Sequence, residues 1–527
     1  MVRGVRWTRG LVVAAMLLVA RAMPAAAQVG AGALAGLVSD PSGHAVAGAL
    51  IIVTLTSNGQ TRTTVSASDG GFVVPGLVPG TYTVRVESNG FRPLSRDGVT
   101  VATGETVALG LGLTVGGVSE AISVTADARL LRSNSASLGQ VVDNEKIVAL
   151  PLNGRTFVLL AGLVPGVALP PNSLLPRING GRPRTNEYLF DGITVLQPEP
   201  GQVAFFPNVD AIQEFKVETN SPPAEFGRFN GGVVNLTTKA GSNTLHGSGF
   251  EFVRNESLNA RNYFASTVPT RPTFRRQQFG GVLGGALRKD RTFFFLDYQG
   301  QRQTIGRTAI STVPTLLQRQ GIFTEAIGGR VPVIYDPATT VGGLRSPFAG
   351  NSIPAHRMDP VVLALLARYP LPTSAGTANN YRRVDDETQD QDQFSLRIDH
   401  QWQQSGISND RVFGRLTRFS EHFIPVTPLP DGSGTTTGTL GPQKTTAYSF
   451  ASNYRRVVSP HVFNELRVGD TRRRVDRTAA TLSGSASGAL GLPGIPSTAR
   501  FPNTLPTFVI TGYQQLGSPA NTASDFS

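Results

Sequence analysis

The sequence predicts a mainly β protein that contains one mixed α+β region. Short runs in which apolar and polar residues alternate recur along the chain, and turn residues separate them. The 527 residues include 59 glycines and 36 prolines, and this content is typical of many short strands joined by turns. Only residues 144–150 and 157–163 have the pattern of short helices. The length predicts roughly three domains.

The first residues have the pattern of a secretory signal peptide. Three arginines within the first nine positions precede an apolar run at residues 11–20, and small residues follow before Gln28. The apolar run is too short to cross a membrane as a helix, which requires about 20 residues. We therefore expect residues 1–27 to be removed by cleavage between Ala27 and Gln28. Any membrane-spanning segments of the mature chain are expected to be strands.

The composition and the spacing of the polar residues argue against an enzyme. The chain has no cysteine, and its six histidines are far apart and form no zinc-binding motif. It also lacks the strand–turn–helix serine of a nucleophile elbow and a phosphate-binding loop. The net charge of +12 comes from scattered arginines rather than from a basic run. We expect no catalytic residue, no cofactor, no metal site and no nucleic-acid partner.

Residues 28–115 have the pattern of a small β-sandwich. Short strands recur about every ten residues and are separated by turns. Three stretches resemble the carboxypeptidase regulatory-like domain, namely residues 36–49, 69–72 and 80–84. Related sandwiches accompany zinc carboxypeptidases, but the histidine spacing makes such an activity unexpected here.

Residues 133–240 combine the two short helices with glycine-rich strands and an Asp-Gly turn. Residues 150–155 (LPLNGR), 178–182 (INGGR) and 224–239 resemble the plug domain of TonB-dependent outer-membrane receptors, in particular their Oar-like group. The resemblance implies a plug domain of mixed α+β structure. Its signature falls on Asn179, Gly180, Arg182, Asp191, Gly192, Glu225, Arg228, Gly231 and Gly232.

The signature residues have separate physical interpretations. Gly231 and Gly232 allow one strand to approach another backbone closely, because they lack a Cβ atom. Glu225 and Arg228 are typical of charges that hold a plug against a barrel wall, and ordinary surface charge explains them equally well. We expect neither of them to bind a ligand.

Residues 116–132 form a linker that contains a candidate TonB box. The candidate residues are Ile122, Ser123, Val124, Thr125 and Ala126, a β-prone stretch without proline. The resemblance implies that the energy-transducing protein TonB captures this segment by strand addition, which needs unpaired backbone groups. One more strand of the sandwich explains the same residues, so both interpretations stay open.

Residues 241–527 have the pattern of an antiparallel transmembrane β-barrel. In residues 394–402, the lipid-facing set is Phe394, Leu396, Ile398 and Trp402, and the lumen-facing set is Ser395, Arg397, Asp399 and Gln401. We place Trp402 at the membrane interface. The same alternation predicts apolar outer faces at Phe250 and Phe252, at Phe294, Leu296 and Tyr298, and at Tyr448, Phe450 and Tyr454. A soluble sandwich also alternates, and the signal peptide and plug resemblance favour the membrane.

The barrel is expected to be incomplete. About seven or eight strands fit between Leu245 and Arg473, whereas plugged transporter barrels have about 22. An open sheet in lipid would leave backbone groups unpaired at its edges. We therefore expect a C-terminally truncated chain or a fragment that contains the N-terminal part of the barrel.

Together these features predict an outer-membrane receptor for the TonB-dependent uptake of a solute. The implied partners are TonB on the periplasmic side, outer-membrane lipid and an unidentified extracellular solute. The alternative is a cell-surface adhesion or scaffold protein that uses the sandwich and long loops such as residues 311–392.

Overall fold

A computed structural model describes most of the chain. It covers residues 31–116, 122–125, 137–171, 173–197, 201–222, 226–227, 229–260, 271–402, 410–434, 441–459, 462–477, 490–492, 505–517 and 524–526, with the backbone alone at 122–125 and 524–526. The predicted signal peptide with its Ala27–Gln28 site, Ala126, Glu225 and Arg228 lie outside the described residues. Within them, no helix is long and apolar enough to span a membrane.

The N-terminal domain, residues 31–116 with residues 122–125, consists of two β-sheets with one apolar core between them. The sheet orders are β4-β1-β7 and β3-β2-β5-β6-β8. The strands are β1 (Gly32–Ser39), β2 (Leu50–Leu55), β3 (Thr61–Val65), β4 (Gly71–Leu77), β5 (Gly80–Glu87), β6 (Leu94–Val101), β7 (Thr106–Gly112) and β8 (Ile122–Thr125). Alternate residues such as Leu34, Ile51 and Val84 are fully buried in this core. The predicted β-sandwich is therefore present.

The backbone of residues 122–125 belongs to this domain in the structure. As β8 it pairs in parallel with β6, and Val124 lies opposite Arg96. β8 is the last strand of its sheet, so its second edge has no partner strand among the described residues. The candidate TonB box therefore adopts the arrangement of the alternative interpretation, a further strand of the sandwich.

The central domain, residues 137–240, has a five-stranded mixed sheet with the order β13-β12-β15-β14-β9. Its elements are β9 (Leu138–Asp143), α2 (Asn144–Ala149), η1 (Phe157–Leu163), β10 (Val167–Ala168), β11 (Arg177–Ile178), β12 (Glu187–Phe190), β13 (Ile193–Thr194), η2 (Val209–Ala211), β14 (Ile212–Asn220) and β15 (Val233–Thr238). Phe157 stacks edge-on against Phe190 and Phe215 in the core. Both predicted helices exist, although the second, η1, is a 3-10 helix.

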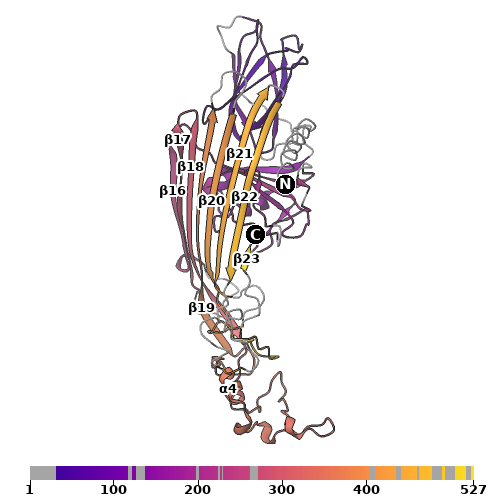
Figure 1. The fold of residues 1–527 in the computed structure, drawn as a ribbon, viewed down its shortest axis with the longest axis vertical. Helices are drawn as coiled ribbons and strands as arrows, with labels where there is room; N and C mark the ends of the chain where they lie inside the picture. The colour runs from indigo at the N-terminus through magenta and orange to yellow at the C-terminus, as the bar shows by residue number, and fades with distance from the viewer. Residues whose placement is uncertain are drawn as a thin grey trace, which may run out of the picture.

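The remaining strands form one antiparallel sheet in sequence order, hereafter the long sheet. They are β16 (His246–Asn255), β17 (Phe274–Arg288), β18 (Thr292–Ser311), β19 (Tyr381–Trp402), β20 (Asp410–Ile424), β21 (Gln443–Ser459), β22 (Val462–Arg477) and β23 (Ser524–Phe526), with the 3-10 turn η4 (Glu256–Leu258) after β16. The first seven are the long strands that the alternation predicts. Figure 1 shows them side by side, with the N-terminal domain at one end and the central domain against one face.

The outer face of the long sheet carries an apolar band. Phe394, Ile398 and Trp402 are 47%, 40% and 45% exposed, whereas Ser395, Arg397 and Asp399 between them are buried. Cross-strand pairing continues the band through neighbours of the same face, namely Phe294, Leu296, Leu416, Phe450, Leu466 and Val468. From Phe394 to Trp402 the strand rises about 26 Å, which is close to the height of the lipid-facing band of a barrel. The predicted division of residues 394–402 into an outer and an inner face is therefore confirmed, and the contact of the outer face with lipid stays a prediction.

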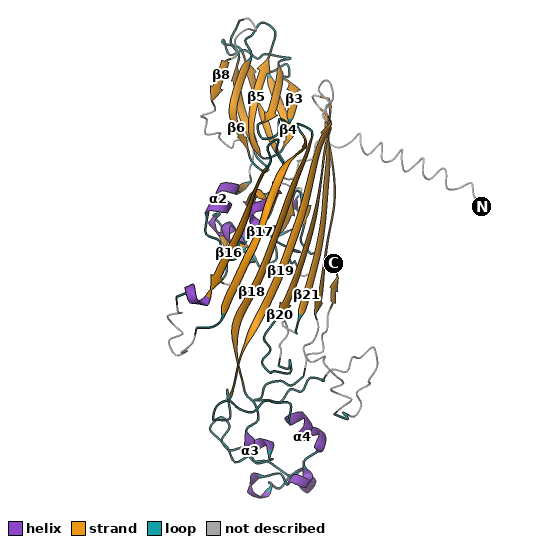
Figure 2. Ribbon diagram, turned by 90° about the vertical axis from the view of Figure 1, so that its left-hand side faces the viewer, coloured by secondary structure: helices purple, strands orange, loops and turns teal. Residues whose placement is uncertain are grey.

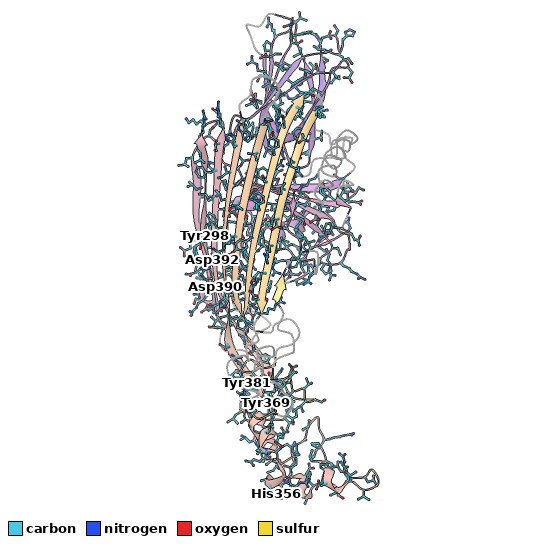
Figure 3. The ribbon with its side chains drawn as sticks, viewed as in Figure 1. Tyr298, His356, Tyr369, Tyr381, Asp390 and Asp392 are labelled. Atoms are coloured by element: carbon cyan, nitrogen blue, oxygen red, sulfur yellow. The ribbon has the colours of Figure 1, made fainter. Side chains whose placement is uncertain are left out.

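The band ends in polar residues on the side away from the N-terminal domain. The Tyr298 hydroxyl donates to Asp392 at 2.7 Å, and Arg302 pairs with the same carboxylate at 3.0 Å. Asp390 follows Asp392 on the same face of β19. Figure 3 labels Tyr298 on β18 and Asp390 and Asp392 on the neighbouring strand β19. Aromatic and charged residues at this level are typical of a membrane–water interface.

A large loop region lies at the far end of β18 and β19 (Figure 2). It spans residues 312–380 and contains α3 (Leu316–Arg319), η6 (Pro337–Thr339), η7 (Ala349–Asn351), η8 (Ala355–Arg357) and α4 (Pro360–Leu366). The loop predicted at residues 311–392 is therefore too long, because β19 already begins at Tyr381. Ion pairs such as Arg307 with Glu387 at 2.8 Å hold these polar ends of the two strands together.

We predict that Leu396→Arg destabilises the membrane-inserted protein by about 2–4 kcal/mol, because it places a charge within the apolar band. Asp390→Arg is the matched control, since it introduces the same side chain on the same strand and face beyond the band. We expect that change to cost no more than about 1 kcal/mol. Urea unfolding in lipid vesicles measures the loss of stability in each variant. Equal losses in Leu396→Arg and Asp390→Arg would mean that the outer face of the sheet lies in water.

Candidate functional site

The candidate functional site is the buried surface between the central domain and the inner face of the long sheet. This inner face is the one opposite to the apolar band. Its side chains are mostly polar or charged, and most are buried, because the central domain covers them. Charged groups taken from water are tolerated only when partners satisfy them. The ion pairs across this surface therefore decide how firmly the two parts adhere.

Asp191 of the central domain is the hub of these contacts. Its carboxylate lies 2.9 Å from Arg415 Nε and 3.4 Å from Arg397 Nη1, and all three side chains are at most 4% exposed. It also accepts hydrogen bonds of 2.9 Å from the backbone N–H and the hydroxyl of Thr238. One carboxylate thus joins β15 of the central domain to β19 and β20 of the long sheet.

The local sequence explains why Asp191 points at the sheet. Asp191 and Gly192 form the tight turn between β12 and β13, with φ of 52° and 82°. Both values lie in the left-handed region, which glycine and aspartate adopt more readily than most residues. Gly192 is also tightly packed, since a Cβ atom there would approach Arg467 Nη1 to 2.8 Å. The turn that the sequence predicts therefore delivers a charge into the interface.

Two further carboxylates on the inner face are each shared by two arginines. Asp399 accepts from Arg397 Nε and from Arg411 Nη2, both at 2.8 Å. Glu465 accepts from Arg455 at 2.6 Å and from Arg467 at 2.8 Å. The arginines extend the network beyond the sheet, since Arg455 Nη1 donates to the Gly76 carbonyl of the N-terminal domain at 3.0 Å.

The loop at residues 150–155 attaches the central domain to the first two strands of the long sheet. The guanidinium of Arg155 lies 4.2 Å and 4.5 Å from the ring centroids of Phe250 and Phe252, and it pairs with Asp210. Asn153 accepts from Arg254 at 3.0 Å. These contacts combine cation–π attraction with hydrogen bonds.

The contacts of Arg155 overturn one prediction. Phe250 and Phe252 were expected on the outer face, but they share the inner face with Gln278, which donates to the Gly154 carbonyl at 3.2 Å. Alternation tells which residues share a face, and it does not tell which face is inside. The pairing of β16 with β17 places both rings on the inner face, where the guanidinium of Arg155 lies over them.

The N-terminal domain also contacts the central domain directly. The turn between β6 and β7 places Thr103 beside the central sheet, where its hydroxyl lies 3.0 Å from that of Thr237. Its backbone N–H donates to Glu214, and Lys216 donates to the Gly104 carbonyl at 3.1 Å. The three parts of the molecule therefore meet through buried polar contacts.

The other signature residues serve the interior of the central domain. Asn179 and Gly180 form a turn with positive φ, and Asn179 donates to the Thr219 carbonyl at 2.5 Å. A Cβ atom at Gly231 would lie 2.9 Å from the Thr185 carbonyl, and one at Gly232 would lie 2.5 Å from the Glu218 carbonyl. The two glycines therefore stand at the close backbone approach expected of them.

Several functional residues escaped the sequence analysis. Arg182, which belongs to the plug signature, is exposed, whereas Arg155, Arg411 and Arg415 carry the contacts described above. For Arg411 and Arg415 the available signal was their inward register on an alternating strand, whereas Arg155 lies in a loop. The partners of Arg155 and Arg415 lie far away in the sequence. In the described part of the chain, no group of three or more histidines and carboxylates could hold a metal ion.

We predict that Asp191→Asn destabilises the docked central domain by about 3–5 kcal/mol, because buried Arg415 and Arg397 lose their shared charge. Asparagine keeps the left-handed turn accessible, so the backbone is preserved. The matched control is Asp392→Asn, which breaks an exposed pair and should cost no more than about 1 kcal/mol. Denaturant unfolding in vesicles compares them, and equal costs would argue against the hub.

We predict that Arg155→Lys loosens the loop at residues 150–155 by about 0.5–2 kcal/mol. Lysine keeps the charge near Asp210 but lacks the planar group that lies over Phe250 and Phe252. Amide hydrogen exchange of this loop should accelerate accordingly. Arg85→Lys on the exposed surface of the N-terminal domain serves as the control, and unchanged exchange in both variants would contradict the proposed attachment.

Comparison with known proteins identifies two families. Residues 237–527 match the family described as outer membrane beta barrel domain, and residues 33–114 match the carboxypeptidase regulatory-like domain. The chain is 29% identical over 303 residues to the TonB-dependent transporter Oar of Myxococcus xanthus, an alignment that covers 55% of this chain and 28% of that protein. The chain thus spans less than a third of the length of this relative.

Solved structures of low sequence identity are also similar. The outer membrane transporter YddB from Escherichia coli has a TM-score of 0.33 at 14% identity, over 64% of this chain and 48% of its own. The siderophore receptor PirA from Pseudomonas aeruginosa has a TM-score of 0.27 at 13% identity, over 64% and 54%.

The matched family and the curated relative are non-enzymatic, which is the class that the sequence predicts. The family match covers more than half of the chain. The chain therefore belongs to the outer membrane beta barrel family, and its location is the outer membrane.

Proposed function

We propose that the chain acts in the TonB-dependent uptake of a solute across the outer membrane. In this proposal residues 28–115 are the regulatory-like sandwich, 116–132 the linker with the TonB box, 133–240 the plug and 241–527 the barrel. The observation that carries the proposal is the burial of the charged inner face of the long sheet beneath the central domain. A domain that seals a polar lumen is what an energy-gated channel requires.

The same contacts suggest how the plug is held and released. The hub at Asp191 and the loop at Arg155 attach the plug to different strands, β19–β20 and β16–β17. Separating a buried ion pair is costly, because it leaves an unpaired buried charge. Each carboxylate pairs with two arginines, so an arginine can be released while the carboxylate keeps the other. Force applied at the periplasmic side would break these contacts one after another and open a path along the lumen.

The proposed periplasmic partner is TonB, which would add a strand at residues 122–126. In the structure β8 uses one edge to pair with β6, and its second edge has no strand beside it among the described residues. Strand addition needs such an edge and little side-chain specificity. The other proposed partners are outer-membrane lipid at the apolar band and an unidentified extracellular solute.

A cell-surface adhesion or scaffold protein is the alternative function. The sandwich and the loops at residues 312–380 would suit it, but it has no need of a domain that covers the inner face. The homology to a TonB-dependent transporter supports transport rather than adhesion.

We predict that Val124→Pro weakens the binding of the periplasmic domain of TonB by about tenfold, because proline removes a backbone donor. Val124→Ala is the matched control, since it shortens the same side chain and keeps the N–H. Titration of labelled TonB domain against the protein in vesicles gives both affinities. Equal binding by the two variants would assign residues 122–125 to the sandwich alone, and no binding by the unmodified chain would favour adhesion.

A further inference from the structure

A small cavity lies where the N-terminal domain meets the inner face of the long sheet. It measures about 20 Å³ and is lined by Gln60, Arg62 and Tyr82 of the N-terminal domain and by Gln401 and Arg411 of β19 and β20. A space of this size holds one water molecule or one ion of similar radius. The comparisons and the proposed transport function assign nothing to this place.

Two buried donors at this cavity lack a partner. Arg62 Nη1 and Arg411 Nε are both inaccessible to solvent, and neither makes a hydrogen bond. Arg411 uses its Nη2 atom for Asp399 at 2.8 Å, while the guanidinium of Arg62 lies 5.6 Å from the ring centroid of Phe463. A buried guanidinium N–H without an acceptor is destabilising, because it has lost its hydrogen bonds to water. The cavity therefore requires an occupant that accepts hydrogen bonds.

The surrounding charge is strongly positive. Three carboxylates of this interface, Asp191, Asp399 and Glu465, pair with five arginines, Arg397, Arg411, Arg415, Arg455 and Arg467. Arg62 is a sixth arginine and has no carboxylate partner in the described residues. Even with Asp297, which lines a neighbouring cavity beside Arg415, six arginines face four carboxylates.

The environment of Arg62 reflects this imbalance. Burial, reinforced by the charges of Arg455 and Arg411, lowers the pKa of Arg62 to about 9. A guanidinium resists deprotonation, so the protein gains more by supplying an anion than by losing the proton.

We propose that the cavity between Arg62 and Arg411 binds a small monovalent anion, with chloride as the physiological example. The anion accepts hydrogen bonds from Arg62 Nη1 and Arg411 Nε and offsets one positive charge. It thereby fastens β3 of the N-terminal domain to β20 of the long sheet. A neutral water molecule would satisfy the donors but leave the charge, and polyatomic anions such as sulfate are too large for the space.

Bromide is the probe for the first test, because it replaces chloride and scatters anomalously. Crystals of the full chain grown in sodium bromide should give an anomalous peak within hydrogen-bonding reach of Arg62 Nη1 and Arg411 Nε. An empty anomalous map at this place, or a water molecule in the cavity, would overturn the proposal. This test needs no variant and does not depend on whether the chain transports a solute.

The second test measures stability in solution. Replacing sodium gluconate by sodium chloride at equal ionic strength should raise the melting temperature of the chain by about 2–4 °C. Arg62→Met keeps the length and packing of the side chain and should abolish this rise. Arg85→Gln, which removes an exposed arginine from the same domain, should leave it unchanged.

The Arg62→Met variant distinguishes a halide bound in this cavity from a halide that acts elsewhere on the protein. A rise that persists in Arg62→Met would mean that the halide acts elsewhere, and the proposal would be wrong. If Arg62→Met does not fold, Arg411→Gln takes its place, because it removes the second donor from the opposite wall of the cavity. Loss of the bromide peak and of the chloride effect in the same variant is the expected result.

Discussion

The inner face of the long sheet is charged, so the central domain can cover it only by supplying partners for the charges that it buries. Arg397, Arg415 and Asp399 are almost completely buried there, and burial costs each of them several kcal/mol of hydration that only a charged partner can offset. The turn at Asp191 and Gly192 supplies the charge that two of these arginines need. The attachment of the central domain to the sheet therefore depends on one electrostatic requirement, the pairing of these buried charges.

The outer face of the long sheet must instead be apolar if it is to contact the hydrocarbon layer of a membrane. Residues that alternate with the buried charges are apolar and exposed over a height that fits the hydrocarbon layer of a membrane. Because the side-chain period of a strand is two, one sequence pattern serves both faces at once. A shift of one residue in register would bring Arg397 into lipid and Leu396 into the interface, so the pairing of β18, β19 and β20 is strongly specified.

Local patterns allowed much of the fold to be predicted. The sandwich, the seven long strands, the helix at residues 144–149 and the Asp-Gly turn all depend on short-range signals, and the structure contains each of them. The contacts that join these parts could not be predicted, because their partners are far apart in the sequence. Phe250 meets Arg155 of the central domain, and Arg62 meets strands more than 300 residues later. Residues 122–125 were ambiguous for a related reason, since a β-prone stretch fits any available sheet edge.

A cysteine pair across the interface tests the central claim most directly, since the chain contains no cysteine of its own. A Cβ atom at Gly469 of β22 would lie 2.6 Å from the side chain of Ile193 in the central domain. Oxidation of the Ile193→Cys, Gly469→Cys protein in membranes should therefore form an intramolecular disulfide in nearly every molecule. The pair Ile193→Cys, Val468→Cys is the control, because Val468 points to the outer face and should not cross-link. Failure of the first pair to cross-link, or equal cross-linking of both, would contradict a central domain seated on the charged inner face of the sheet.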